Sequence, residues 1–194
     1  RDALLSRGGL PVDRLPEGAR VGTGSLRRGA QLLSLRPDLE ILPLRGNVDT
    51  RIRKLREGGD YDAIILAAAG LGRMGLTSEA SEIIPPDVMV PAPGQGIIAV
   101  EIREDDPRAF EIAASLTHEE TWTAAAAERA FLKGLGGDCN VPAGAYAEVE
   151  KGFIRMTGII ASPDGRKIVK ETVSGPVREP ETLGEGLARG LMDN

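Results

Sequence analysis

An unbroken apolar run, AIILA at residues 63–67, constrains the fold more than any other stretch of this 194-residue chain. The run has the length of a strand, and it lacks the alternation with polar side chains that marks a strand with one wet face. Strands buried on both faces are typical of parallel sheets that carry helices on each side. The run therefore predicts an α/β domain built around it.

The segments before this run alternate between strand and helix patterns. Strands are expected at residues 19–21 and 40–44, and Pro43 places the second at a sheet edge. Helices are expected to begin at Ser25 and Asn47, whose side chains can cap a first turn. Their inward faces should carry Leu26, Ala30 and Leu33 in the first helix and Val48, Ile52 and Leu55 in the second. Residues 1–18, with a Gly-Gly pair and two prolines, are expected to form a lead-in or linker.

The second half is expected to change architecture. The sequence VPAPGQG at residues 90–96 predicts a hinge or crossover, followed by a strand over residues 97–102. A helix is expected at residues 119–133, ended by Gly134. Beyond it, an antiparallel meander and a covering helix are expected, with strands at residues 146–149, 153–160 and 167–173 and the helix at residues 181–192. This unit is predicted to be a small α+β domain.

Charge and composition exclude several classes of protein. The net charge of −5 argues against a general binder of nucleic acid, and no apolar run approaches the roughly 18 residues of a membrane span. One cysteine excludes an internal disulfide, and one cysteine with one histidine cannot make a zinc site. That histidine, His118, stands at an expected helix start, where an exposed polar residue is the simpler interpretation. The chain opens on RDAL without Met, so we expect a piece of a longer protein.

Five arginines follow the expected strands of the first unit: Arg27 and Arg28 after the first, Arg45 and Arg51 after the second, and Arg73 after the third. Open α/β sheets bind ligands at the carboxyl ends of their strands. In a first helical turn the macrodipole disfavours Arg27 and Arg28 by roughly 0.3–1 kcal/mol each, unless an anion lies there. An uncompensated cluster of this kind is unfavourable without an anion, so the arginines at the strand ends predict an anion site.

The alternative is that these arginines are solvated and pair with surface acids. We prefer that interpretation for Arg53, Lys54 and Arg56, which lie further along the second helix. Guanidinium groups at the strand ends suit carboxylates or phosphates. Residues 22–25 lack the spacing and the lysine of a Walker phosphate loop. Several carboxylates on one ligand would explain several separated arginines.

The only cysteine, Cys139, lies in GGDCNVPAGAYA at residues 136–147. A lone cysteine is usually a small buried hydrophobic residue. Here the glycines and the proline predict a loop, and a loop thiol can be reached by a ligand. Asp138 raises the pKa of a neighbouring thiol, which suits a sulfur that is modified once better than a fast nucleophile.

Five motifs occur in order along the chain: VGTGSLRR at residues 21–28, LRGNVDTR at 44–51, YDAIILA with GLGR at 61–73, PGQG at 93–96, and the Cys139 loop. In order and approximate spacing they resemble the motifs of the porphobilinogen deaminase (hydroxymethylbilane synthase) family. Asp138 is a departure, since the family more often has glycine there. The resemblance covers essentially the whole chain. It implies an α/β domain with a parallel or mixed sheet like that of periplasmic binding proteins, and then a small α+β domain with a three-stranded antiparallel sheet.

Enzymes of this family join four porphobilinogen molecules head to tail, releasing ammonia, on a covalent dipyrromethane cofactor. The resemblance implies that Cys139 holds this cofactor through a thioether. It assigns cofactor contacts to Ser25, Arg27, Arg28, Arg45 and Gly46, substrate contacts to Arg51, Arg73 and Gln95, and no metal. It further implies a monomer of the cytoplasm, or of the plastid stroma in a photosynthetic eukaryote, whose partner is porphobilinogen rather than nucleic acid or a membrane.

By the same resemblance, residues 1–90 correspond to domain 2, residues 91–116 to a hinge and a return to domain 1, and residues 117–194 to the C-terminal domain. The missing part of domain 1 carries the catalytic aspartate, so the chain alone is expected to be inactive. The acids that precede the strands do not fit as substitutes; they are Asp38, Glu40, Asp60 and Asp62. Asp138 beside the cysteine is conceivable, but nothing in the sequence makes it more than a solvated loop acid. The competing hypothesis is a non-catalytic module that binds a carboxylate or oxyanion. An intact mass without a dipyrromethane adduct would favour it.

Overall fold

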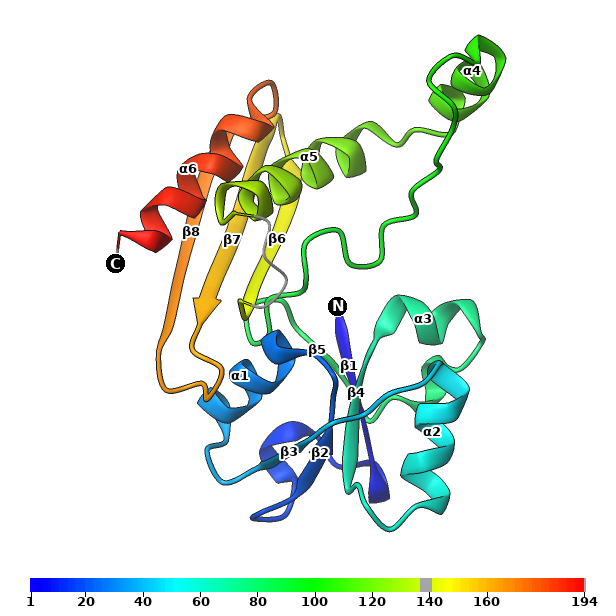
Figure 1. The fold of residues 1–194 in the computed structure, drawn as a ribbon, viewed down its shortest axis with the longest axis vertical. Helices are drawn as coiled ribbons and strands as arrows, with labels where there is room; N and C mark the ends of the chain where they lie inside the picture. Colours follow the sequence, from blue (N-terminus) through cyan, green and yellow to red (C-terminus); the bar gives the residue numbers. More distant parts are fainter. Residues whose placement is uncertain (137–140, 194) are drawn as a thin grey trace.

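The computed structural model describes residues 1–136 and 141–193, which form two units, each built on its own sheet (Figure 1). The strands of the first unit are β1 (Asp2–Ser6), β2 (Arg20–Gly22), β3 (Glu40–Leu42), β4 (Ala63–Ala67) and β5 (Glu82–Ile84). Its helices are α1 (Leu26–Leu35), α2 (Val48–Glu57) and α3 (Ala68–Arg73), with short 3-10 turns η1 (Arg7–Gly9), η2 (Val12–Arg14) and η3 (Thr77–Glu79). The second unit contains α5 (Glu119–Gly134), β6 (Ala143–Glu150), β7 (Phe153–Ala161), β8 (Ile168–Pro176) and α6 (Pro180–Met192).

The first unit is organised around β1 and β4. Its sheet has the order β3-β2-β4-β1-β5; β2 runs parallel to β3 and β4, whereas β1 runs antiparallel to both β4 and β5. The linker expected over residues 1–18 is therefore wrong at its start, because residues 3–5 are apolar and buried within the sheet. Since β1 is reversed, its amino end pairs with the carboxyl end of β4, and Asp2 lies opposite Ala67.

β4 is buried on both faces, as the apolar run predicts. Ala63 and Ile65 pack into one cluster with Leu32 of α1, whereas Ile64 and Leu66 pack into a second cluster on the side of α2. This alternation is the two-residue period of a strand covered by helices on each side. The α/β class is confirmed, although the sheet is mixed rather than wholly parallel.

Helix α1 begins after Ser25 as expected, but the predicted buried face is confirmed only at Ala30. The Oγ of Ser25 accepts a hydrogen bond from the backbone N–H of Arg28 at 3.4 Å. Leu26 is exposed and Leu33 is only half-buried. The polar side chains buried along the helix are those of Arg27, Arg28 and Gln31. They lie inside because neighbouring segments satisfy their hydrogen bonds, which offsets the cost of burying polar groups.

The predictions for α2 and β3 are confirmed. The Asn47 side chain accepts a hydrogen bond from the N–H of Thr50 at 2.9 Å, so it caps α2. Ile52 and Leu55 are buried against the sheet. β3 is an edge strand and ends before Pro43, whose missing N–H would otherwise interrupt a ladder.

The second unit is the predicted meander, with strand order β6-β7-β8 and with α5 and α6 on one face (Figure 1). Positive φ angles of 52° at Lys151 and 81° at Gly152 form the turn from β6 to β7. Phe131 and Met156 are fully buried between helices and sheet. The two helices approach closely at Gly184, where an added side-chain carbon would collide with the carbonyl oxygen of Ala127.

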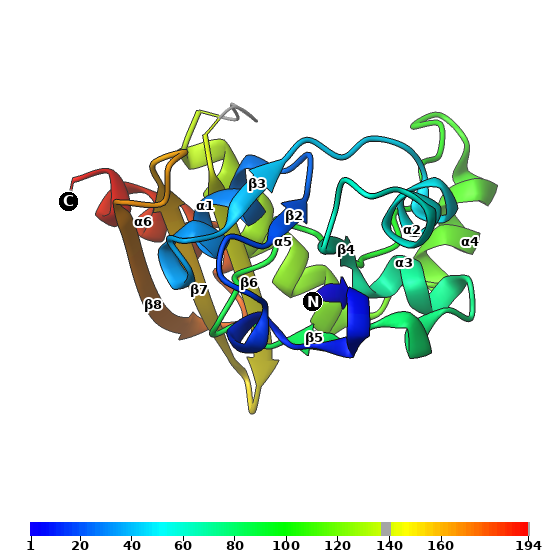
Figure 2. The same ribbon diagram turned by 90° about the horizontal axis from the view of Figure 1, so that it is seen from below.

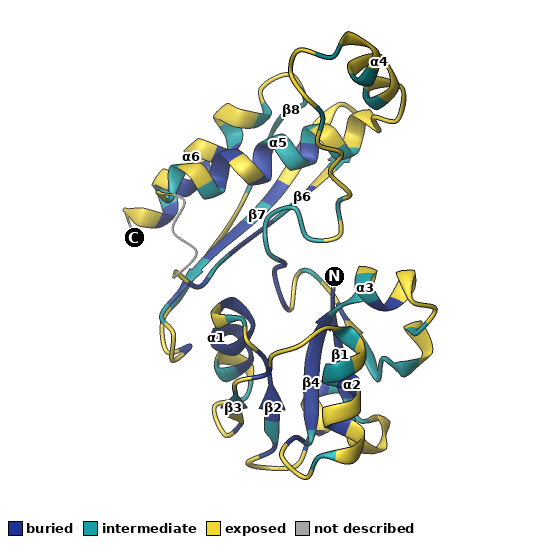
Figure 3. Cartoon of the chain, turned by 45° about the vertical axis from the view of Figure 1, so that its right-hand side comes forward, coloured by how far each residue is buried: buried dark blue, intermediate teal, exposed yellow. Residues whose placement is uncertain are grey.

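Helix α4 (Pro107–Ser115) lies apart from both sheets, at the end of the molecule away from the C-terminus (Figure 2). The strand expected over residues 97–102 is wrong, because none of the described strands lies beside this stretch to pair its backbone. Much of this stretch and of α4 is exposed (Figure 3), and several large apolar side chains there are open to solvent. They are Ile98, Val100, Phe110, Ile112 and Leu116.

The two units touch at the hinge and at the turn between β7 and β8. The N–H of Ala145 donates to the carbonyl of Pro91 at 2.9 Å. Gly144 approaches so closely that an added Cβ would lie 2.8 Å from the Pro91 carbonyl oxygen and 3.1 Å from Cδ of Arg27. At the second contact, Gly165 lies against the backbone of α1 with a φ of 69°. Glycine at these positions lets the units meet backbone to backbone.

Glu128 of α5 ties the hinge to the second unit through a buried carboxylate. One oxygen accepts a hydrogen bond from the N–H of Gly94 at 2.6 Å, and the other accepts from the N–H of Ala147 at 2.8 Å. Burial raises the pKa of Glu128, and the two backbone donors offset this only in part.

We expect Glu128 to make stability depend on pH. Because its pKa is higher in the folded than in the unfolded state, its contribution is complete below the ordinary glutamate value of 4.5 and is lost as the pH rises through the raised pKa. Over that range the wild type should lose stability relative to Glu128→Gln, which cannot titrate. Urea unfolding of both proteins at a series of pH values tests this. A difference that stays constant with pH would contradict the expectation.

Candidate functional site

The carboxyl ends of β2, β3 and β4 meet at the sheet edge that faces the second unit (Figure 1). All three helices of the first unit begin there, after Ser25, Asn47 and Ala67. Open α/β sheets bind ligands at this edge. The reversed β1 adds Asp2 to it.

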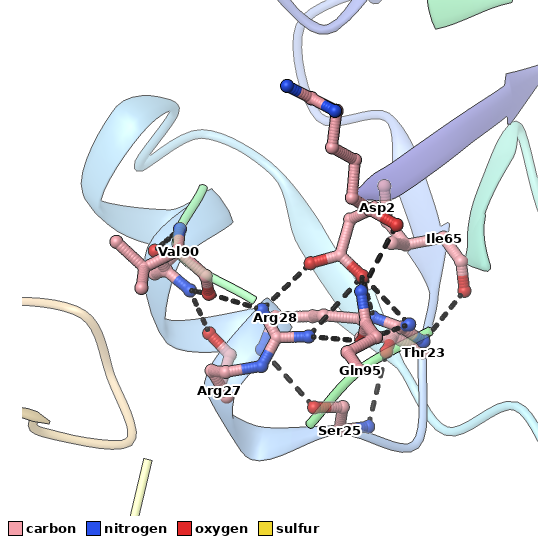
Figure 4. Close-up of polar contacts among 10 residues, drawn as sticks. Asp2, Thr23, Ser25, Arg27, Arg28, Ile65, Val90 and Gln95 are labelled. Carbon is pink, nitrogen blue, oxygen red and sulfur yellow. Dashed lines mark hydrogen bonds and ion pairs between the residues drawn. The ribbon is translucent and has the colours of Figure 1, made fainter. Parts of the chain in front are cut away.

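Asp2 is wholly buried and is shared by Arg27 and Arg28 (Figure 4). Its Oδ2 lies 2.8 Å from Nη1 of Arg27, and its Oδ1 lies 2.9 Å from Nε and 2.8 Å from Nη2 of Arg28. Both arginines are buried, with 6% and 8% of their surface exposed. The expectation of an uncompensated cluster is therefore wrong, because Asp2 neutralises part of its charge.

Gln95 of the hinge segment completes this cluster (Figure 4). Its Nε2 donates to Oδ1 of Asp2 at 3.0 Å. Its Oε1 accepts from Nη2 of Arg27 at 3.3 Å and from Nη2 of Arg28 at 3.4 Å. The backbone carbonyl of Val90 accepts from Nη1 of Arg27 at 2.7 Å. The hinge is thereby bonded to the arginines from both of its ends.

The pKa shifts follow from this arrangement. Burial by itself would raise the pKa of Asp2, but the charges and hydrogen bonds of Arg27 and Arg28 outweigh burial and hold the pKa below its ordinary value. Burial lowers the pKa of Arg28, Asp2 opposes this, and the charges of Arg27 and Arg51 add to it. Asp2 is therefore a carboxylate at neutral pH, and the cluster of two arginines and one aspartate carries one excess positive charge.

Most donors of the buried arginines are already used. A guanidinium has five N–H bonds. Four hydrogen bonds or ion-pair contacts join Arg27 to described acceptors, and four join Arg28. Each arginine therefore keeps about one N–H for a ligand.

The arginines of the later loops are more open. Arg45 and Arg73 are exposed, and neither side chain has a hydrogen bond or ion pair within residues 1–136 and 141–193. Nε of Arg51 donates to the carbonyl of Gly46 at 2.7 Å, and Gly46 has a φ of 124°. Thr50 lies where a Cβ at Gly46 would be, so only glycine fits that turn. Arg45 and Arg73 can offer whole guanidinium groups to carboxylates, and Arg51 keeps its two Nη groups for the same purpose.

Two of the acids considered as substitutes for a catalytic aspartate, Asp62 and Asp38, lie away from this edge, and Asp138 lies outside the described residues. Asp62 pairs with Arg20 at 3.0 Å, at the amino ends of β4 and β2, and this lowers the pKa of Asp62. Asp38 pairs with Arg36, which lowers the pKa of Asp38 to about 2. Arg56 forms a surface ion pair, as preferred for that part of α2. Neither Asp62 nor Asp38 lies at the ligand edge.

Comparison with known proteins identifies the family. Residues 1–111 match the sequence model described as porphobilinogen deaminase, dipyromethane cofactor binding domain, and residues 122–193 match that of the porphobilinogen deaminase C-terminal domain. The chain belongs to the porphobilinogen deaminase family. Porphobilinogen deaminases of Roseiflexus sp. (strain RS-1) and Geobacillus kaustophilus are 52% and 51% identical to the whole chain, over 193 and 194 residues. The chain spans 63% and 62% of the lengths of these two relatives.

The hydrogen-bond donors at the sheet edge fit the dipyrromethane cofactor of the porphobilinogen deaminase family. Each pyrrole of that cofactor carries two carboxylates, and the open forks of Arg45, Arg51 and Arg73 suit such groups. Cys139, expected to hold the cofactor, lies outside the described residues. Within residues 1–136 and 141–193, no three His, Cys, Asp or Glu side chains are placed to hold a metal, and no helix could cross a membrane.

Of the expected site residues, the structure brings Arg27, Arg28 and Gln95 into direct contact. It gives Ser25 the role of a helix cap. Sequence reasoning missed Asp2, the acid that holds this group together. The signal was present, because Asp2 precedes the apolar run of residues 3–5, but the glycines and prolines that follow favoured a linker.

Proposed function

We propose that this chain is the larger part of a hydroxymethylbilane synthase, a cytoplasmic transferase that works as a monomer. The reaction joins four porphobilinogen molecules head to tail and releases ammonia at each step. A dipyrromethane held by Cys139 would supply the terminal pyrrole carbon to which each new unit is added. The chain spans less than two thirds of its relatives, so the complete activity is assigned to the longer protein.

One observation carries this proposal: the segment that follows the Cys139 loop packs directly on the arginine edge. The Cα of Gly144 faces Cδ of Arg27 without an intervening side chain. Gly144 is five residues from Cys139, and five residues span at most about 18 Å of chain. A group carried by Cys139 therefore has the sheet edge within reach.

The arginines then have separate tasks. Arg45, Arg51 and Arg73 would bind the carboxylates of the cofactor and of the incoming units with their free forks. Arg27 and Arg28 would add one N–H each and one shared excess charge. Ser25 fixes the start of α1, so that both arginines leave the helix in its first turn.

We further propose that residues 1–90 and 117–194 act as domains joined by the hinge and return segment of residues 91–116. The exposed apolar side chains of that segment are what a covering domain would bury. The catalytic aspartate would belong to that domain. The chain by itself should therefore bind ligand without sustained turnover.

The attachment at Cys139 can be tested by intact mass. Protein produced in cells that make porphobilinogen should carry the mass of a dipyrromethane, and Cys139→Ser should have the bare polypeptide mass. His118→Ser is a matched control, because that exposed side chain only caps α5. An adduct that persists in Cys139→Ser would move the anchor elsewhere. Bare mass in every protein would favour a non-catalytic binding module.

A further inference from the structure

Asp2 has a position that an ordinary structural ion pair does not need. It lies at the ligand edge of the sheet, is wholly buried, and faces two guanidinium groups at once. Within residues 1–136 and 141–193, no other carboxylate pairs with Arg27 or Arg28. A buried charge cluster of this kind is poor at stabilising a fold, because apolar residues of similar volume do as well or better.

The carboxylate of Asp2 occupies the groups that a ligand carboxylate would use. Its two oxygens take donors from both arginines at 2.8–3.3 Å, and the amide of Gln95 takes two more Nη2 hydrogens. Its charge also cancels one of the two positive charges. Asp2 therefore competes with any anion that approaches this pair.

We propose that Asp2 is a positioning residue that sets the strength with which Arg27 and Arg28 hold a carboxylate ligand. It keeps one excess charge and about two free N–H donors at this subsite, so that a carboxylate is bound there and can also leave. This inference rests on the proposed function, in which the same edge binds the carboxylates of the cofactor and of the incoming units. Carboxylates are then bound more strongly by the more open side chains of Arg45, Arg51 and Arg73.

The test is equilibrium binding by the 194-residue protein, in a Cys139→Ser background that keeps binding reversible. Porphobilinogen and citrate are titrated calorimetrically. Citrate is a tricarboxylate without a pyrrole ring, so its binding reports the positive charge of the site alone. Asp2→Asn should bind both at least about tenfold more tightly at low ionic strength, because a like charge a few ångströms from the anion has been removed. The gain should shrink at high salt. Asp62→Asn, which removes the partner of Arg20 at the opposite edge, should bind as the parent does.

A second pair of variants distinguishes the effect of net charge on binding from an effect on folding. Arg27→Gln should weaken binding, and Asp2→Asn added to Arg27→Gln should restore it by about tenfold, because the cluster returns to one excess charge. This comparison decides the matter even where Asp2→Asn alone does not fold. Equal or weaker binding after Asp2→Asn in a folded protein, or no restoration in the double variant, would overturn the inference. Binding of citrate without porphobilinogen would refute the proposed ligand and leave the role of Asp2 standing.

Discussion

Arg27→Leu should cost about 3 kcal/mol of unfolding free energy, whereas Arg45→Leu should change it by less than about 0.5 kcal/mol. Arg27 is buried and bonded to Asp2 and Val90, so its loss leaves a buried carboxylate with Arg28 and Gln95 alone. Breaking a buried pair typically costs 3–5 kcal/mol, and the remaining partners hold the loss near the lower limit.

Arg45→Leu should instead act on the ligand. Its side chain is exposed and makes no bond within the described part of the chain, so folding does not need it. Losing a charge-assisted hydrogen bond of about 1.5–3 kcal/mol should slow cofactor loading or chain elongation about tenfold or more in the complete enzyme. Arg53→Leu is the control, since Arg53 is also exposed and unpaired in this part of the molecule but lies away from the strand ends. Urea midpoints and loading rates are the measurements. Equal stability losses in Arg27→Leu and Arg45→Leu would show that the two arginines do not differ as described.

Gly184→Ala should destabilise the second unit by about 3 kcal/mol. Its Cβ would enter the backbone of α5 at the Ala127 carbonyl and would lie 2.9 Å from the Phe131 nitrogen. Neither atom can move without displacing the helix, so the clash is an overpacking cost at the upper end of the usual range.

Gly186→Ala is the matched control on the same helix, and it should raise the free energy of unfolding rather than lower it. An added Cβ there meets nothing within 4 Å. Replacing an exposed helical glycine by alanine stabilises a helix by about 0.5–1 kcal/mol. Urea unfolding of both variants gives the comparison. A neutral Gly184→Ala would mean that α5 and α6 are not in backbone contact at this position.

The elements that sequence reasoning predicted well are those fixed by local chemistry. The meander follows from two turns, and Lys151 with Gly152 adopts the positive φ angles that a tight hairpin requires. The caps at Ser25 and Asn47 likewise depend on residues three positions away. Such signals can be read from the chain without knowledge of its tertiary contacts.

The errors concern residues whose partners are distant in sequence. The face of α1 was mispredicted because Arg27 and Arg28 are buried by Asp2 and Gln95, which no helical periodicity can indicate. The strand expected at residues 97–102 has a suitable apolar pattern but no neighbour to pair with in the described part of the chain. The roles of the site residues stay predictions, since they depend on a ligand and on Cys139.

The reversed position of β1 also affects how the protein folds during synthesis. Among the strands of this sheet β1 is synthesised before the others, yet its two neighbours are β4 and β5, so Asp2 pairs with Ala67 and Ile84. Bringing β1 and β4 together closes a long loop, which costs conformational entropy before any contact between the strands stabilises it. Folds rich in such distant contacts form slowly. The meander of the second unit pairs only consecutive strands. The nascent chain therefore has to keep the apolar β1 unpaired until β4 has been made, and one edge of β1 stays open until β5 follows, which exposes the first unit to aggregation for longer than the second.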